Sequence, residues 1–77
     1  MTATNEEWTD RAKRFFRAEM QRAGFGYDDL VKKLAEMGIE ESVGSITVKV
    51  NRGTYPAWFL FAAMKAMGRD HVRIDEA

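Results

Sequence analysis

The residues of this chain best suited to chemistry lie between positions 42 and 52, and that chemistry is recognition rather than catalysis. They combine hydroxyl, aliphatic and basic side chains, namely Ser42, Ser45, Thr47, Val48, Lys49 and Arg52. Hydroxyl groups can bond to base edges or phosphates, Lys and Arg can reach phosphate or guanine, and an exposed valine can contact the thymine methyl group. The segment therefore predicts contacts with double-stranded DNA, although a solvated helix face with one exposed valine fits the same residues equally well.

A second set of basic residues lies upstream of this segment. Its members are Arg14, Arg17, Arg22, Lys32 and Lys33. They are candidates for phosphate contacts beside a helix in the groove, but a solvated helix face is the more common explanation for each one taken singly. Asp10, for example, lies four residues before Arg14, and an ion pair at that spacing stabilises a helix by roughly 0.3 kcal/mol without any ligand.

The sequence carries no pattern that indicates catalysis or a metal site. It lacks a nucleophile elbow, a phosphate-binding loop, metal-ligand spacing and paired carboxylates, and it has no cysteine for a disulfide or a thiolate site. His71, the one histidine, follows Asp70 in what we expect to be a solvated tail. We therefore predict that the protein is not an enzyme and uses no cofactor or metal.

The charge balance argues against a strong attraction to nucleic acid. Twelve Lys and Arg residues balance twelve Asp and Glu residues, so the formal net charge at pH 7 is +0, whereas many DNA-binding domains are distinctly basic. Basic residues outnumber acidic ones between positions 11 and 33, while Glu36, Glu40 and Glu41 make the next segment acidic. A small protein-interaction module therefore remains the alternative to a DNA-binding protein.

The spacing of apolar residues indicates the helices that position these side chains. A first helix is predicted over residues 5–23, with Thr4 and Glu7 as a capping box and Gly24 as its end. Its inward stripe repeats at intervals of three and four residues, and consists of Trp8, Ala12, Phe15, Phe16, Met20 and Ala23.

Two shorter helices are expected next, over residues 27–37 and 43–51, with Ile39 filling the core between them. The first turns five apolar side chains inward: Tyr27, Leu30, Val31, Leu34 and Met37. Ser42 is the best cap for the second helix, whose inner face carries Val43, Ile46, Thr47 and Val50. A strand is the competing prediction over residues 45–50, because β-branched residues alternate there, but an isolated strand would lack a pairing partner.

A fourth helix is predicted over residues 57–67, after Pro56, and Lys65 is its only charged side chain. A helix that is apolar on all sides has to be covered on more than one side, which three partner helices cannot do completely in so small a domain. We therefore expect a homodimer formed through large side chains of this helix: Trp58, Phe59, Phe61 and Met64. The tail is expected to form a short strand at residues 71–74 or to be disordered at its end.

The length of the chain allows one domain. We predict an all-α fold, a compact bundle of four helices that contains a helix-turn-helix, over residues 5–68, with a flexible N-terminus at 1–4 and a tail at 69–77. The amino terminus lacks the regions of a signal peptide, and the longest uncharged run, residues 53–64, is too short to span a bilayer. The expectation is a soluble cytoplasmic protein without membrane contact.

Residues 27–68 resemble the lambda-repressor-like (Cro/C1-type) helix-turn-helix superfamily, and more closely a group of small bacterial domains of uncharacterised function built on that plan. The matching positions are Leu30, Leu34, Ile46, the ending at Asn51 to Gly53, and Pro56 before the following helix. The chain departs from the pattern at Val31, where a small alanine is usual. It also departs in the run "AEMGIEES", which makes the turn longer than in the compact repressor form.

That resemblance implies an all-helical bundle that binds double-stranded DNA, commonly as a dimer. It puts five residues in the recognition helix: Ser42, Ser45, Thr47, Lys49 and Arg52. We therefore interpret the chain as a sequence-specific DNA-binding protein, a transcriptional regulator that acts as a homodimer and places its third helix in the major groove.

Overall fold

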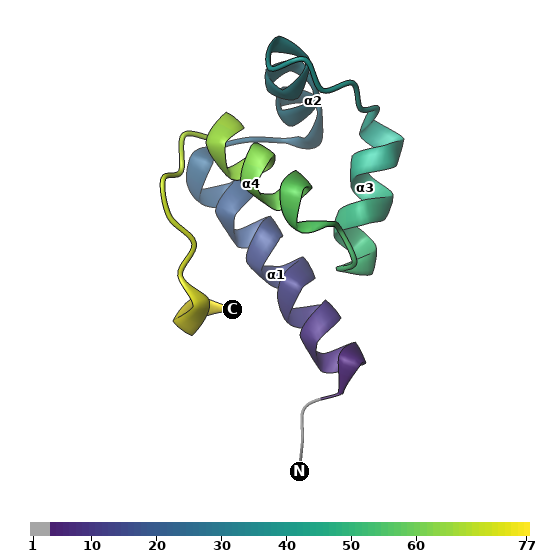
Figure 1. Cartoon of the computed structure of the whole chain (residues 1–77), viewed down its shortest axis with the longest axis vertical. Coiled ribbons are helices and arrows are strands. Elements are labelled where there is room, and N and C mark those ends of the chain that lie inside the picture. Colours follow the sequence, from purple (N-terminus) through teal and green to yellow (C-terminus); the bar gives the residue numbers. More distant parts are fainter. Residues whose placement is uncertain (1–3) are drawn as a thin grey trace.

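The computed structural model describes residues 4–77, and the described chain forms a bundle of four α-helices (Figure 1). The helices are α1 (Asn5–Ala23), α2 (Tyr27–Glu36), α3 (Val43–Arg52) and α4 (Ala57–Ala66), and a short 3-10 turn follows at Ile74–Glu76. The predicted all-α bundle is confirmed, with helix ends within one residue of those expected. Over the described residues there is no strand, so the strand alternatives at residues 45–50 and 71–74 are wrong.

Local capping explains where the helices begin. The Thr4 hydroxyl oxygen accepts a hydrogen bond from the Glu7 backbone N–H at 3.1 Å, and the Ser42 hydroxyl oxygen accepts one from the Ser45 N–H at 3.0 Å. The Asp29 carboxylate accepts a bond from the Gly26 N–H at 2.8 Å before α2. Each contact satisfies a backbone donor that has no partner inside its helix. The starts of three helices therefore follow from residues within one turn of them.

The core forms where all four helices meet. The largest fully buried side chains are Phe16, Phe59, Leu30, Leu34, Ile46 and Val50. Phe16 of α1 stacks on Phe59 of α4 with ring centroids 5.8 Å apart, and the Tyr55 ring meets Phe16 edge-on at 5.2 Å. Aromatic pairs in these arrangements add to the stabilisation that burial provides. The stacking of Phe16 on Phe59 thus brings together α1 and α4, which lie far apart in the sequence.

Five side chains lie on the opposite side from the one predicted. Trp8, Met37 and Val43 were expected to face inward but are 50%, 44% and 45% exposed. Each lies at a helix end, and the first turns of α1 extend past the other helices (Figure 1). Phe59 and Met64 were expected at a dimer interface but are buried, at 0% and 4% exposure. The core of the single chain already covers most of both side chains, and their role at a dimer interface stays a prediction.

The arrangement leaves α3 at one edge of the molecule and the C-terminal tail at the other. Figure 1 shows the tail running along α1 on the side away from α3. The turn between α2 and α3 packs Ile39 against the core. No helix within residues 4–77 has the length and apolar content needed to cross a lipid bilayer.

Candidate nucleic-acid interface

Helix α3 has a fully buried face and an exposed face. Ile46 and Val50 anchor it in the core at 0% exposure, and Val48 on the other side is 49% exposed. The outward surface is formed by exposed residues from three successive turns: Ser42, Gly44, Val48, Asn51 and Arg52. These residues supply a hydroxyl, an amide, a guanidinium and a methyl surface, which are the groups that read base edges in a major groove. Below, we call these five residues the α3 face.

Three of the six predicted base-reading residues, Ser42, Val48 and Arg52, belong to the α3 face, where the Ser42 hydroxyl also caps the helix. The side chains of the other three bind within the protein. The Ser45 hydroxyl donates to the Glu41 carboxylate at 2.7 Å, and the Lys49 ammonium lies 2.5 Å from the other Glu41 oxygen. The Thr47 hydroxyl donates to the Val43 carbonyl oxygen at 2.7 Å, within the helix. These contacts hold the three polar groups in place at the edge of the α3 face.

The Glu41 carboxylate has its charge compensated inside the protein. Its side chain is 7% exposed. Burial raises the pKa of the Glu41 carboxyl, but hydrogen bonds from Lys49 and Ser45 and the positive charge of Lys49 outweigh that effect, so the net pKa is lowered. Of the two acidic residues just before α3, Glu41 is therefore neutralised by an ion pair, while Glu40 is exposed.

Lys49 also connects α3 to α4. Its Nζ atom lies 4.9 Å from the centre of the Phe59 ring and 5.8 Å from the centre of the Trp58 ring. A cation over an aromatic face is attracted by the electron density of the ring. Lys49 is therefore a structural tie between Glu41 and the aromatic start of α4, with 29% of its side chain exposed.

The predicted phosphate contacts divide among three surfaces. Arg17 of α1 donates a hydrogen bond to the side-chain oxygen of Asn51, which places it beside the α3 face. Arg14 pairs with Asp10 at 2.9 Å, and both Arg14 and Arg22 line a hollow of about 400 Å³ between α1 and Ala77. That hollow lies on the tail side of α1, so these two arginines and the α3 face do not form one surface (Figure 1).

The two predicted lysine contacts lie on α2. Lys32 and Lys33 line a shallow hollow of about 290 Å³ with Gly24 and Phe25 of the preceding turn. Lys33 is also 3.7 Å from Glu36, one turn further along the helix. Of the five predicted phosphate contacts, Arg17 is the one that a described hydrogen bond joins to α3.

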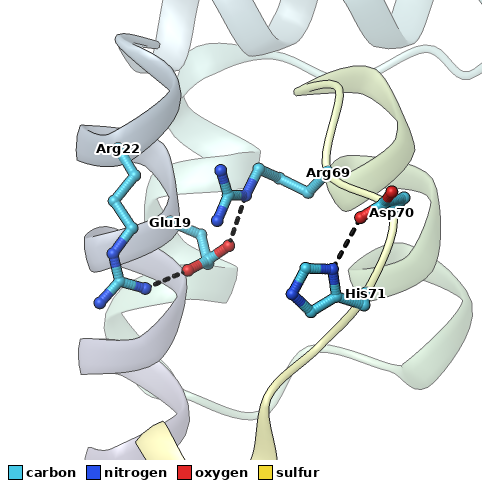
Figure 2. Close-up of polar contacts among 5 residues, drawn as sticks. All are labelled: Glu19, Arg22, Arg69, Asp70 and His71. Carbon is cyan, nitrogen blue, oxygen red and sulfur yellow. Dashed lines mark hydrogen bonds and ion pairs between the residues drawn. The ribbon is translucent and has the colours of Figure 1, made fainter.

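A second polar cluster lies between the end of α1 and the tail (Figure 2). Glu19 is 3% exposed, and its carboxylate accepts hydrogen bonds from Arg22 and, at 2.8 Å, from the Nε atom of Arg69. Asp70 and His71 form a separate exposed pair at 2.7 Å, and the hydrogen bond from His71 lowers the pKa of Asp70. Glu19 thus attaches the segment after α4 to α1.

Sequence reasoning missed the role of Glu19, although a signal was present. Glu19 lies three residues after Phe16 and four after Phe15, so helical spacing places it on the apolar face. A buried carboxylate needs a partner, and the partner Arg69 is 50 residues away in the chain. Tyr55 was missed in the same way: its hydroxyl donates to the Ala12 carbonyl oxygen at 2.7 Å, and burial raises the pKa of Tyr55 to about 12.

Among the side chains that the structure describes, no group of three or more His, Cys, Asp or Glu is placed to hold a metal ion. The hollows lie at the surface, and the α3 face exposes a hydroxyl, an amide, a guanidinium and an aliphatic side chain. What the arrangement can do chemically is donate and accept hydrogen bonds and contact methyl groups.

Comparison with known proteins places the chain in one family. The model of a domain of unknown function (DUF6471) matches residues 8–72, which include all four helices from the second turn of α1 onward. No curated protein and no solved structure matches the chain.

Proposed function

We propose that this chain, which belongs to the DUF6471 family of domains of unknown function, is a double-stranded DNA-binding protein of the lambda-repressor-like helix-turn-helix type that regulates transcription. One observation carries the proposal. The α3 face is exposed, while the opposite side of the same helix is anchored in the core by Ile46 and Val50. A short helix held rigidly from behind and uncovered in front is what insertion into a major groove requires.

Four of the five residues of the α3 face have a role that their chemistry supports. Arg52 donates to guanine or phosphate, the Asn51 amide suits adenine, and Val48 contacts a thymine methyl group. Gly44 has no side chain and lets the helix backbone approach the DNA closely. Arg17 orients Asn51 through their hydrogen bond and also carries a charge to the phosphate backbone. Lys49 acts indirectly, by neutralising Glu41 beside this surface.

The charge distribution predicts moderate affinity with a shallow dependence on salt. Each phosphate contact contributes a slope of about −0.9 to the change of log affinity with log salt concentration. Arg17 and Arg52 are the basic side chains exposed at or beside the α3 face. We therefore expect a slope of only a few units, because the remaining basic residues lie elsewhere or are paired with acids.

A protein-interaction module is the second candidate, and one observation favours it. Trp58 and Phe61 are 53% and 65% exposed on α4, and the net charge of the chain is +0. Exposed aromatic side chains at such a surface suit binding to another protein. This candidate places the contact surface on α4 rather than on α3.

The test is binding of the purified protein to random-sequence duplex DNA over a range of salt concentrations, with two matched variants. Arg52→Ala and Arg14→Ala each remove one exposed arginine and change the net charge equally, but only Arg52 belongs to the α3 face. We expect Arg52→Ala to weaken binding at low salt by roughly fivefold or more and to reduce the salt slope by about 1. Arg14→Ala should leave both quantities unchanged.

Two results would count against the proposal. Absence of binding at low salt by a folded protein would contradict DNA binding and favour the protein-interaction module. Equal losses in the two arginine variants would mean that charge alone drives the binding and that the α3 face does not contact DNA.

A further inference from the structure

Helix α4 carries a protruding side chain and a hollow on the same side. Trp58 is 53% exposed and Phe61, one turn later, is 65% exposed. Beyond Phe61 lies a hollow of about 420 Å³. It is lined on α4 by Phe61, Met64 and Lys65, and on the segment after α4 by Arg69, Asp70, His71 and Val72. Because Trp58 and Lys65 are seven residues apart, they share one face of the helix at a separation of roughly 10 Å.

We infer that a second copy of this chain covers this face, with the two α4 helices packed antiparallel about a two-fold axis beside Phe61 and Ala62. In an antiparallel pair with that axis, residue 58 of one copy lies opposite residue 65 of the other. The indole of each Trp58 then enters the hollow beside Lys65 of the second copy. A two-fold interface uses the same patch twice, so the protrusion and the hollow have to lie on one surface, as they do here.

The chemistry of the two ends is complementary as well as their shape. Lys65 is the only charged residue of α4 and lies at the edge of the hollow. An ammonium group beside an indole is a favourable pair, and Trp is the aromatic residue that binds cations best. Phe61 near the axis packs against the small Ala62 of the other copy, which permits close approach of the helices. A second copy therefore complements this face in shape and in charge, and the two-fold axis repeats the contact between Trp58 and Lys65 at both ends of the interface.

This inference does not rest on the DNA-binding proposal. The five residues of the α3 face are separate from the contact surface on α4, so self-association can be measured without DNA. Failure of either proposal leaves the other unaffected.

Sedimentation equilibrium at tens of micromolar protein tests the association. We expect a dimer for the natural sequence, and an increase of about tenfold or more in the dissociation constant for Trp58→Ala, because a central tryptophan commonly dominates an interface. Trp8→Ala is the matched control: Trp8 is 50% exposed on α1, outside the proposed contact, and its loss should leave the dissociation constant unchanged. Circular dichroism of both variants confirms that the helices are retained.

Cysteine cross-linking tests the register while leaving Trp58 and Phe61 intact. The chain has no cysteine, so each introduced thiol can form a disulfide only with the same residue of another copy. Ala62→Cys lies beside the proposed axis and should form a disulfide-linked dimer, whereas Lys65→Cys should not, because the two copies of residue 65 are roughly 10 Å apart along the helices.

A natural sequence that stays monomeric at these concentrations would overturn the inference. Equal effects of Trp58→Ala and Trp8→Ala would do so too, since they would place the contact elsewhere. Cross-linking of both cysteine variants would indicate parallel helices and would refute the antiparallel register.

Discussion

Gly44 and Gly53 lie near opposite ends of α3, and the fold requires glycine at only one of these two positions. Gly53 ends the helix with a φ of 65°, in the left-handed region, and a Cβ atom there would overlap the carbonyl oxygen of Thr9 on α1. Gly44 has helical backbone, and the nearest atom to a Cβ there is the Ser42 hydroxyl oxygen at 4.0 Å. The fold therefore needs glycine at position 53, whereas nothing in the fold explains glycine at position 44.

We expect Gly53→Ala and Gly44→Ala to change stability in opposite directions. Gly53→Ala should lower the free energy of unfolding by about 2 to 3 kcal/mol, through backbone strain and the overlap with Thr9. Gly44→Ala should raise it by up to about 1 kcal/mol, because alanine favours a helix more than glycine does. Urea denaturation of both variants measures this, and a loss of stability in Gly44→Ala would show that glycine has a structural role there.

At the scale of the elements, the turn between α2 and α3 is held by an ion pair rather than by apolar packing alone. Glu41 in the turn binds Lys49 two helical turns along α3, and Lys49 in turn lies over the Phe59 ring of α4. This contact sets how α3 sits against α4. Breaking a partly buried ion pair leaves a charge without its partner, which is more costly than losing a surface pair.

Stability should therefore depend on the ionisation of Glu41. Its pKa in the folded protein lies below the ordinary value of 4.5, so the carboxylate stabilises the fold above about pH 4.5 and this contribution is lost as the pH falls through the folded pKa. Glu41→Gln should reduce the free energy of unfolding at pH 7 by about 1 to 2 kcal/mol. The free energy of unfolding of this variant should also fall less steeply than that of the natural protein as the pH is lowered. Thermal unfolding between pH 3 and pH 7 measures both effects. Glu40→Gln, at an exposed position, is the control variant. A similar effect in both variants would contradict the role of the ion pair.

The elements could be predicted from the sequence because their determinants are local. Thr4 and Ser42 cap helices within one turn, and the spacing of Leu30, Leu34, Ile46 and Val50 marks the buried faces. The side-chain contacts at the candidate site could not be predicted, because the contact between Glu41 and Lys49 depends on the conformation of the turn between α2 and α3. The burial of Phe59 likewise depends on Phe16, which lies 43 residues earlier in the chain.

At the scale of the whole molecule, α1 is joined to the C-terminal half by several long-range polar contacts. The Tyr55 hydroxyl binds the Ala12 carbonyl, Arg17 binds Asn51, and Arg69 binds Glu19. These contacts are spread along α1 from its middle to its last turn. They fix the orientation of the long helix across the bundle in addition to the aromatic core.

Tyr55→Phe should weaken this attachment without disturbing the ring packing. We expect a loss of about 1 kcal/mol in the free energy of unfolding, the usual contribution of one hydrogen bond. Because the folded pKa of Tyr55 is about 12 against an ordinary value of 10.0, its contribution is complete below pH 10 and is lost as the pH rises towards 12. The variant should therefore lose less stability between pH 9 and pH 12 in denaturant titrations. Tyr27→Phe is the control, and identical alkaline behaviour in both variants would contradict the assignment.

Lys49 lies at the edge of the α3 face and also contacts the ring of Trp58 on α4. The Lys49 side chain therefore lies next to two surfaces that belong to different helices. A ligand on one surface that shifts Lys49 can change the affinity of the other surface for its own ligand. Because thermodynamic linkage is reciprocal, the second ligand then changes the affinity for the first by the same factor. The ammonium group of Lys49 therefore provides a physical link by which occupancy of α3 and of α4 can become cooperative.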